Sequence, residues 1–236
     1  MPMPATTSPS TARARRACAC RASSATRAIP GKVWSIFPGI ASRRIEAMRI
    51  IGRDTYRRMP WKNGQGLTEE VAAFPEGSGV EGFDWRLSIA HVDSDGPFSP
   101  FPGIDRTIAL LDGPGLFLDL PDGGCVALSP GGAPFSFPGE WAVSSRNAGG
   151  PTVDLNVMTR RGRCGHVLRR LPLDGERRLR AEGVTLLVSS GDVRLGAGGV
   201  WQGLHRFDAA VLDPGEEVLL AAARPCDVLV ASVFAS

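Results

Sequence analysis

The 236-residue chain has little lysine, histidine or tyrosine, and it has no long apolar run. It contains two lysines against 25 arginines, together with three histidines and one tyrosine. No stretch reaches the roughly 18 consecutive apolar residues that a membrane-spanning helix needs. We therefore expect no membrane partner.

The cysteines do not form a disulfide framework. Two of the five lie in the first 47 residues, and Cys125, Cys164 and Cys226 are far apart in the remainder. There is no CxxC motif, and an odd, dispersed set of cysteines argues against structural disulfides. Free thiols in a reducing cytosol fit better, so we expect a cytoplasmic protein.

Recognisable metal and catalytic motifs are also absent from the sequence. The histidines His91, His166 and His205 are isolated, whereas metal ligands usually come at close spacing from one or two elements. There is no Gly-x-Ser-x-Gly elbow, phosphate loop or dinucleotide fingerprint. We expect neither a metal nor a cofactor. A cysteine nucleophile paired in space with a histidine stays open.

Charge is distributed unevenly along the chain. Residues 1–47 hold seven arginines and one lysine against one acidic residue, whereas residues 48–236 hold 19 basic and 23 acidic residues. A nucleic-acid-binding domain usually carries its basic patch on the folded part. The mildly acidic remainder therefore argues against a nucleic-acid partner.

Residues 1–47 are rich in Ala, Arg, Ser and Thr and have no apolar segment of the secretory type. We expect this tail to be disordered. It has the composition of a transit peptide; the alternative is an over-extended reading frame with Met48 as the true start.

The rest of the chain is typical of an all-β protein. Its 29 glycines and 19 prolines separate short apolar runs, as in a β-sandwich or barrel. The expected strands are 48–51, 67–74, 83–92, 107–112, 115–120, 125–128, 141–145 and 152–158, then 183–189, 193–196, 200–207, 209–212, 218–222 and 228–234. The only expected helix is 173–182.

Two of these expected strands have polar residues along one face. In 83–92, apolar residues alternate with Arg86 and Ser88, and in 152–158 they alternate with Asp154 and Asn156. If the sheet curls into a barrel, these faces line a shared interior pocket. Exposure of both faces to solvent is the alternative. A buried Arg86 would need Asp84, another carboxylate or an anionic ligand.

A glycine-rich segment holds the one lysine that follows residue 47. Lys62 lies in Lys-Asn-Gly-Gln-Gly, where glycines allow positive φ and close approach to the backbone. A compact ammonium among so many arginines suggests a site with a specific need for it. An ordinary turn with a solvated lysine is the alternative.

Several motifs occur in an order that resembles the HutD/Ves family. They are MPWKNG at 59–64 followed by Gly66, Thr68 and Glu70, FDWRLSIA at 83–90, GPFS at 96–99, FPG at 101–103 followed by Arg106, and DLNVM at 154–158. The resemblance is strong over residues 50–161 and weaker toward the C-terminus. Gln65 departs from the family, which commonly has a glycine there.

This resemblance implies a bicupin fold, with residues 48–161 as a first half holding the ligand pocket and 162–236 as a second, scaffolding half. It also implies a cytoplasmic accessory or regulatory protein of histidine utilisation. The implied partner is a small acidic metabolite such as N-formylglutamate or formiminoglutamate, bound without a metal.

Physical pattern and resemblance together predict one ligand site. Lys62, Arg86 and Arg106 would anchor the acid, and neutral or acidic groups would hold its amide or imine end. The predicted ligand-binding residues are Lys62, Asn63, Gly64, Gly66, Thr68, Glu70, Arg86, Ser88, Phe101, Arg106, Asp154 and Asn156.

Two other functions stay open. The first is a metal-free cupin-type enzyme, an isomerase or hydrolase, with Lys62 or Glu70 as acid or base. The second is a structural partner of a pathway enzyme that uses the basic stretch 160–170, which is otherwise a solvated connector. Exposed strand edges also make a homodimer an expectation.

Overall fold

The computed structural model describes residues 48–61, 64 and 66–236, which form seventeen strands, one short α-helix and one 3-10 turn. The helix, α1, spans Gly79–Gly82, and the turn, η1, spans Arg53–Thr55. The predicted all-β class is confirmed. The expected disorder of residues 1–47 lies outside the described residues.

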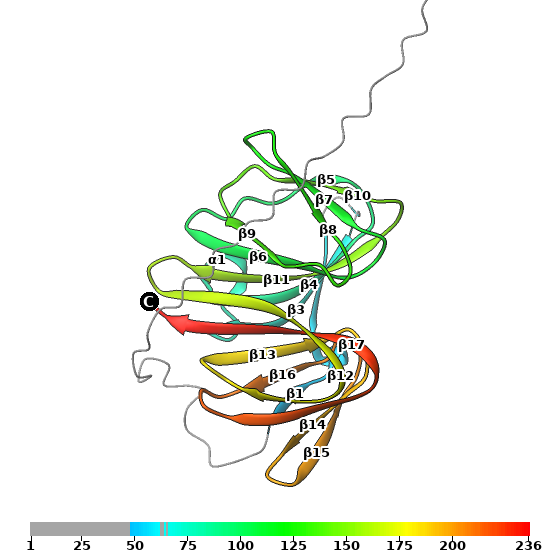
Figure 1. The fold of residues 1–236 in the computed structure, drawn as a ribbon. Helices are drawn as coiled ribbons and strands as arrows, with labels where there is room; N and C mark the ends of the chain where they lie inside the picture. The colour runs from blue at the N-terminus through cyan, green and yellow to red at the C-terminus, as the bar shows by residue number, and fades with distance from the viewer. Residues whose placement is uncertain (1–47, 62–63, 65) are drawn as a thin grey trace, which may run out of the picture.

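The middle layer is a six-stranded antiparallel sheet that runs through the centre of the molecule (Figure 1). In spatial order its strands are β2 (Arg57–Pro60), β3 (Gly66–Phe74), β4 (Trp85–Val92), β11 (Thr152–Arg160), β6 (Ile104–Asp112) and β9 (Phe135–Pro138).

A seven-stranded antiparallel sheet lies on one side of this layer, toward the bottom of Figure 1. Its strands are β1 (Arg49–Ile51), β16 (Ala209–Leu212), β13 (Val184–Ser189), β17 (Glu217–Ala235), β14 (Val193–Ala197) and β15 (Val200–Leu204), with β12 (Cys164–Arg180) also paired to β17.

A four-stranded antiparallel sheet lies on the other side, at the top of Figure 1. Its strands are β5 (Gly96–Pro97), β10 (Ser144–Asn147), β7 (Leu116–Asp119) and β8 (Cys125–Leu128).

Successive side chains of a strand point to opposite faces of the sheet, so apolar side chains form a separate core on each side of the middle sheet. Trp85 and Leu87 of β4 belong to a cluster with Leu186 of β13, which joins the middle and seven-stranded sheets. Ile108 of β6 belongs to another cluster with Leu118 of β7, which joins the middle and four-stranded sheets. The opposite face of the seven-stranded sheet carries a third apolar cluster that includes Leu187, Leu195 and Leu220.

The prediction of a helix at 173–182 is wrong. Residues 173–180 continue β12, which pairs with β17 over most of its length and has a register shift between Leu173 and Gly175. Leu173 and Leu179 pack into the apolar cluster of the seven-stranded sheet. Gly175 has a φ of 77°, a conformation incompatible with a helix but suited to a bulge.

The basic stretch 160–170 is not simply a connector. It includes the end of β11 and, from Cys164, the beginning of β12. Arg170 is buried there and reaches across to Asp227 of β17 at 2.8 Å.

None of the helices among the described residues is both long and apolar enough to cross a membrane.

Candidate functional site

One face of the middle sheet carries polar side chains from four adjacent strands, β3, β4, β11 and β6. Asn156 of β11 lies opposite Ser88 of β4, and Met158 lies opposite both Arg86 of β4 and Arg106 of β6. Since side chains two residues apart share a face, Asp154 belongs to the same surface. We call this surface the polar wall; it consists of Glu70, Arg86, Ser88, Arg106, Asp154 and Asn156.

The polar wall faces the four-stranded sheet and is buried. Ile108, two residues after Arg106, contacts the leucines of that sheet. Arg86, Ser88 and Asn156 are each less than a tenth exposed, and Asp154 is 1% exposed. Exposure of these polar faces to solvent, the alternative to an interior surface, is therefore wrong.

Arg86 has a carboxylate partner within the wall. Its Nε donates to Glu70 Oε2 at 2.6 Å, and both side chains are largely buried. Asp84, the nearest candidate in sequence, instead pairs with Arg163 at 3.1 Å at the end of the sheet. A buried, paired Arg86 is held rigidly, so it is suited to position a ligand group beside it.

Arg106 lies among aromatic rings rather than carboxylates. Its guanidinium carbon lies 5.1 Å from the ring centres of Phe98 and Phe137 and 5.5 Å from that of Phe101. Its Nη1 donates to the Ser99 carbonyl oxygen at 3.3 Å. Burial lowers its pKa to about 10, so Arg106 remains a cation at neutral pH.

Asp154 is a carboxyl group without a direct counter-ion among the described residues. Its Oδ1 is buried and has no hydrogen-bond partner there. Burial raises the pKa of Asp154 to about 7, against the opposing effect of the nearby Arg106 charge. The group therefore titrates near neutral pH.

Three buried atoms of the wall have no hydrogen-bond partner among the described residues: Arg106 Nε, Asp154 Oδ1 and Asn156 Oδ1. Buried polar groups are nearly always paired, because an unpaired one costs on the order of 1–3 kcal/mol. One donor and two oxygens left unpaired on one surface are what a polar ligand or ordered water would satisfy.

The remaining predicted residues lie around this wall or outside the described residues. Thr68 accepts a hydrogen bond from Trp61 Nε1 at 2.8 Å. Gly64 has a φ of 69°. Gly66 is required because a Cβ there would lie 2.5 Å from the His91 carbonyl oxygen and 2.9 Å from the Trp61 ring. The predictions for Lys62 and Asn63 fall on residues that are not described.

The aromatic partners Phe98 and Phe137 were absent from the predicted site. Phe98 lies within the GPFS motif, so its position was available, but nothing indicated contact with Arg106. Phe137 lies in β9, which was not predicted as a strand. The alternation of Phe135 and Phe137 was the available signal.

The family model for HutD matches residues 53–230. The chain belongs to the HutD family. The HutD-family segment contains every described residue of the polar wall, so the family assignment applies to the part of the chain that carries the candidate site.

Relatives agree with this HutD assignment. The chain is 37% identical over 175 residues to an uncharacterised 21.2 kDa protein in the hutC 3′ region of Pseudomonas putida, covering 73% of this chain and 90% of the relative. It is 40% identical over 112 residues to protein Ves of Citrobacter koseri, covering 46% of this chain and 57% of that protein.

Solved structures of HutD-like proteins share the fold. HutD from Pseudomonas fluorescens SBW25 is 31% identical, with a TM-score of 0.66 over 80% of this chain and 100% of that one. A conserved protein of unknown function from Pseudomonas aeruginosa PAO1 is 33% identical, with a TM-score of 0.72 over 79% of this chain and 98% of that one. A more distant structure, that of protein YlbA from Escherichia coli, shares the fold alone: it is 8% identical, with a TM-score of 0.58 over 80% of this chain and 90% of that one.

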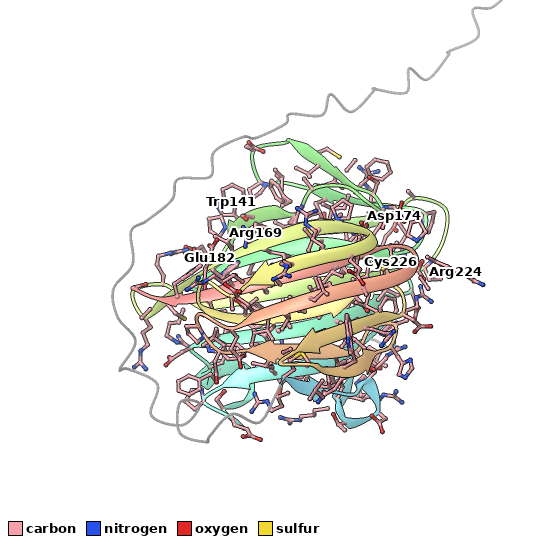
Figure 2. All side chains as sticks on the ribbon, turned by 60° about the horizontal axis from the view of Figure 1, so that its bottom comes forward. Trp141, Arg169, Asp174, Glu182, Arg224 and Cys226 are labelled. Atoms are coloured by element: carbon pink, nitrogen blue, oxygen red, sulfur yellow. The ribbon has the colours of Figure 1, made fainter. Side chains whose placement is uncertain are left out.

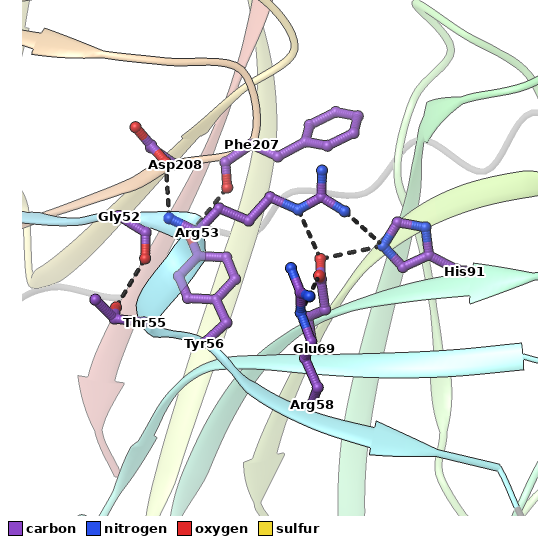
Figure 3. Close-up of polar contacts among 9 residues, drawn as sticks. All are labelled: Gly52, Arg53, Thr55, Tyr56, Arg58, Glu69, His91, Phe207 and Asp208. Atoms are coloured by element: carbon purple, nitrogen blue, oxygen red, sulfur yellow. Dashed lines mark hydrogen bonds and ion pairs between the residues drawn. The ribbon is translucent and has the colours of Figure 1, made fainter.

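This HutD-family chain has another buried carboxylate, Glu69, on the opposite face of β3. Glu69 Oε2 accepts from Arg53 Nε at 2.9 Å and lies 3.1 Å from His91 Nε2, and Glu69 Oε1 lies 3.2 Å from Arg58 Nε (Figure 3). Arg53 also donates its backbone N–H to Asp208 at 2.8 Å. The cluster therefore ties the middle sheet to the loop before β16, which is a structural role.

Surface hollows occur elsewhere on the HutD-family fold, where β12 and β17 bend. One, of about 370 Å³, is lined by residues that include Asp174, Ser190 and Cys226. Figure 2 shows Asp174, Cys226 and Arg224 on the same side of the molecule. Burial and nearby carboxylates raise the pKa of the Cys226 thiol, which makes it a poor nucleophile.

In the described part of the HutD-family chain, no three His, Cys, Asp or Glu side chains form a group that could hold a metal ion.

Proposed function

We propose that this HutD-family chain is a bicupin protein that binds a small carboxylic acid at the polar wall and serves histidine utilisation in the cytoplasm as an accessory or regulatory factor. Residues 48–161 form the half that binds, and 162–236 form the half that supports it. The family's association with histidine utilisation supports the role, and N-formylglutamate or formiminoglutamate fits the wall's chemistry.

The observation that carries the proposal is the buried, unpaired polarity of the wall. Arg106 offers a cation and a free Nε–H to an anionic group. Asn156 Oδ1 offers an acceptor to an N–H group of the same ligand. A ligand with a carboxylate and an amide or imine nitrogen satisfies both, and a site of this kind rejects analogues that leave its groups unpaired.

The third apolar cluster, on the far face of the seven-stranded sheet, supports the same division of roles. The core of the seven-stranded sheet away from the middle layer is built from apolar side chains such as Leu187, Leu195 and Leu212. The wall, in contrast, buries two arginines and two carboxyl groups. Buried charge is costly unless it is paired and hydrogen-bonded, and Arg106 Nε and Asp154 Oδ1 lack such partners among the described residues, so we assign the ligand to the first half.

A metal-free enzyme is the second candidate function. The observation that favours it is Asp154, whose burial raises its pKa to about 7, a value suited to general acid–base chemistry. Formation of a product from N-formylglutamate, formiminoglutamate, urocanate or glutamate, and its loss in Asp154→Ala, would establish an enzymatic function. Binding without turnover favours the accessory role.

Calorimetric titration tests the proposed function. At least one of N-formylglutamate, formiminoglutamate, urocanate and glutamate is expected to bind. Arg106→Met should weaken that binding roughly 10- to 100-fold, because a hydrogen bond to a charged group contributes on the order of 1.5–3 kcal/mol.

The matched control is Arg146→Met. Arg146 also contacts a phenylalanine ring, at 5.3 Å, but it is exposed on β10 and pairs with Asp119. This variant should bind like the wild type. No binding of any of the four acids, or equal affinity of Arg106→Met and wild type with both folded by circular dichroism, would overturn the proposal.

A further inference from the structure

Asp154 lies on β11 at one end of the polar wall, with apolar neighbours directly beside it. In the sheet register it lies opposite Ala90 of β4 and Leu110 of β6. The four-stranded sheet presents Leu116 and Leu118 toward this side. Its carboxyl group therefore sits in a mostly apolar setting at 1% exposure.

The charged groups on the same face of the sheet as Asp154 come from β6, β4 and β3. Arg106 of β6 acts on it electrostatically, but no ion pair joins the two among the described residues. Arg86 of β4 and Glu70 of β3 are already bound to each other at 2.6 Å and cancel in charge. Asp154 thus lacks the direct donor that usually stabilises a buried carboxylate.

The protonation state of Asp154 decides the charge of the wall. With Asp154 neutral, the Arg86–Glu70 pair cancels and Arg106 leaves one positive charge for an anion. With Asp154 ionised, that charge is already offset and a bound anion would lie beside a buried carboxylate. Like charges in one buried site strongly favour protonation of one of them.

We propose that Asp154 is protonated in the complex, so that the site binds an acid anion together with one proton from solvent. The inference rests on the proposed function and goes beyond it by assigning the proton to one residue. The neutral carboxyl group then acts as a hydrogen-bond donor to the ligand anion, which selects for ligands with an acceptor at that position.

The direction of the pH dependence follows from linkage. Burial raises the pKa of Asp154 in the free protein to about 7, and a bound anion raises it further. Below pH 7 the proton is already present, so binding takes up little. Above pH 7 Asp154 is ionised in the free protein, so each binding event takes up one proton from solvent. The dissociation constant is therefore expected to rise about tenfold per pH unit.

Calorimetry in buffers of different ionisation enthalpy measures this uptake directly. With N-formylglutamate as the probe, we expect a small fraction of a proton per ligand at pH 6 and close to one at pH 8.5. In Asp154→Asn, which cannot take up the proton, both the uptake and the pH dependence of the dissociation constant should disappear. Asp119→Asn on β7, where the aspartate side chain is 37% exposed and lies outside the polar wall, should behave like wild type.

The outcomes separate this inference from the function on which it rests. Binding of N-formylglutamate with no uptake at pH 8.5, or equal uptake by wild type and Asp154→Asn, overturns the inference alone. Absence of binding by all four acids overturns the proposed function and the inference with it.

Discussion

Replacing Glu70 by alanine is expected to lower the free energy of unfolding by about 3–5 kcal/mol. Arg86 Nε donates to Glu70 Oε2 at 2.6 Å, and the two side chains are 5% and 11% exposed. Removing the carboxylate leaves a buried guanidinium without its counter-ion. Urea denaturation followed by tryptophan fluorescence measures the loss.

An exposed pair of similar geometry provides the control. Arg146 Nε and Nη2 donate to Asp119 at 2.7 and 2.8 Å, but these side chains are 50% and 37% exposed. Asp119→Ala should therefore cost only about 0–1 kcal/mol. The double variant Glu70→Leu, Arg86→Met should recover much of the lost stability, since no charge is left buried. Equal losses from Glu70→Ala and Asp119→Ala would contradict the argument.

The strands that build the polar wall were readable from the sequence because their alternation is clean. Residues 83–92 contain β4, and residues 152–158 lie within β11. Phe83 is an exception: it precedes β4 and packs with Ile104 and Met158 rather than with Trp85. Alternation fixes a face only while the backbone is extended, so it fails at strand ends.

The longest strands were the hardest to predict. Residues 218–222 and 228–234 were expected as two strands but form the single β17. Its pairing with β12 shifts register across Arg224 and Pro225, from Leu173–Cys226 to Gly175–Ala222, without ending the strand. β12 was missed because its exposed arginines hide the period of two and because Gly175 interrupts it at a bulge. Long-range pairing between β12 and β17 holds both strands extended, and the local sequence does not encode that pairing.

The inward-facing side chains of the candidate site were easier to predict than their interaction partners. Alternation indicated that Arg86 and Asp154 face inward, but it could not assign Glu70 to Arg86 because a register shift between Glu70 and Ala72 sets that pairing. The rings around Arg106 come from a loop and from β9, segments joined only by the folded chain. Such contacts depend on tertiary packing and not on spacing.

Arg170→Met is expected to cost about 3 kcal/mol of unfolding free energy, because one buried guanidinium connects separate parts of the fold. Its Nη1 donates to Asp227 of β17 at 2.8 Å and its Nε to the Gly132 carbonyl oxygen at 2.7 Å. Its Nη2 donates to the Leu110 carbonyl oxygen of β6. Methionine retains much of the apolar stem but leaves these three oxygens without their donor.

The neighbouring arginine of β12 tests whether burial explains this cost. Arg169 is about half exposed and approaches Glu182 only to 3.9 Å, at the side of the molecule opposite Asp174 in Figure 2. Arg169→Met should change the free energy of unfolding by no more than about 0.5 kcal/mol. Hydrogen exchange should further show faster exchange in β6 and β17 for Arg170→Met but not for Arg169→Met. If both variants lose the same stability, Arg170 does not join the middle and seven-stranded sheets in the way its contacts indicate.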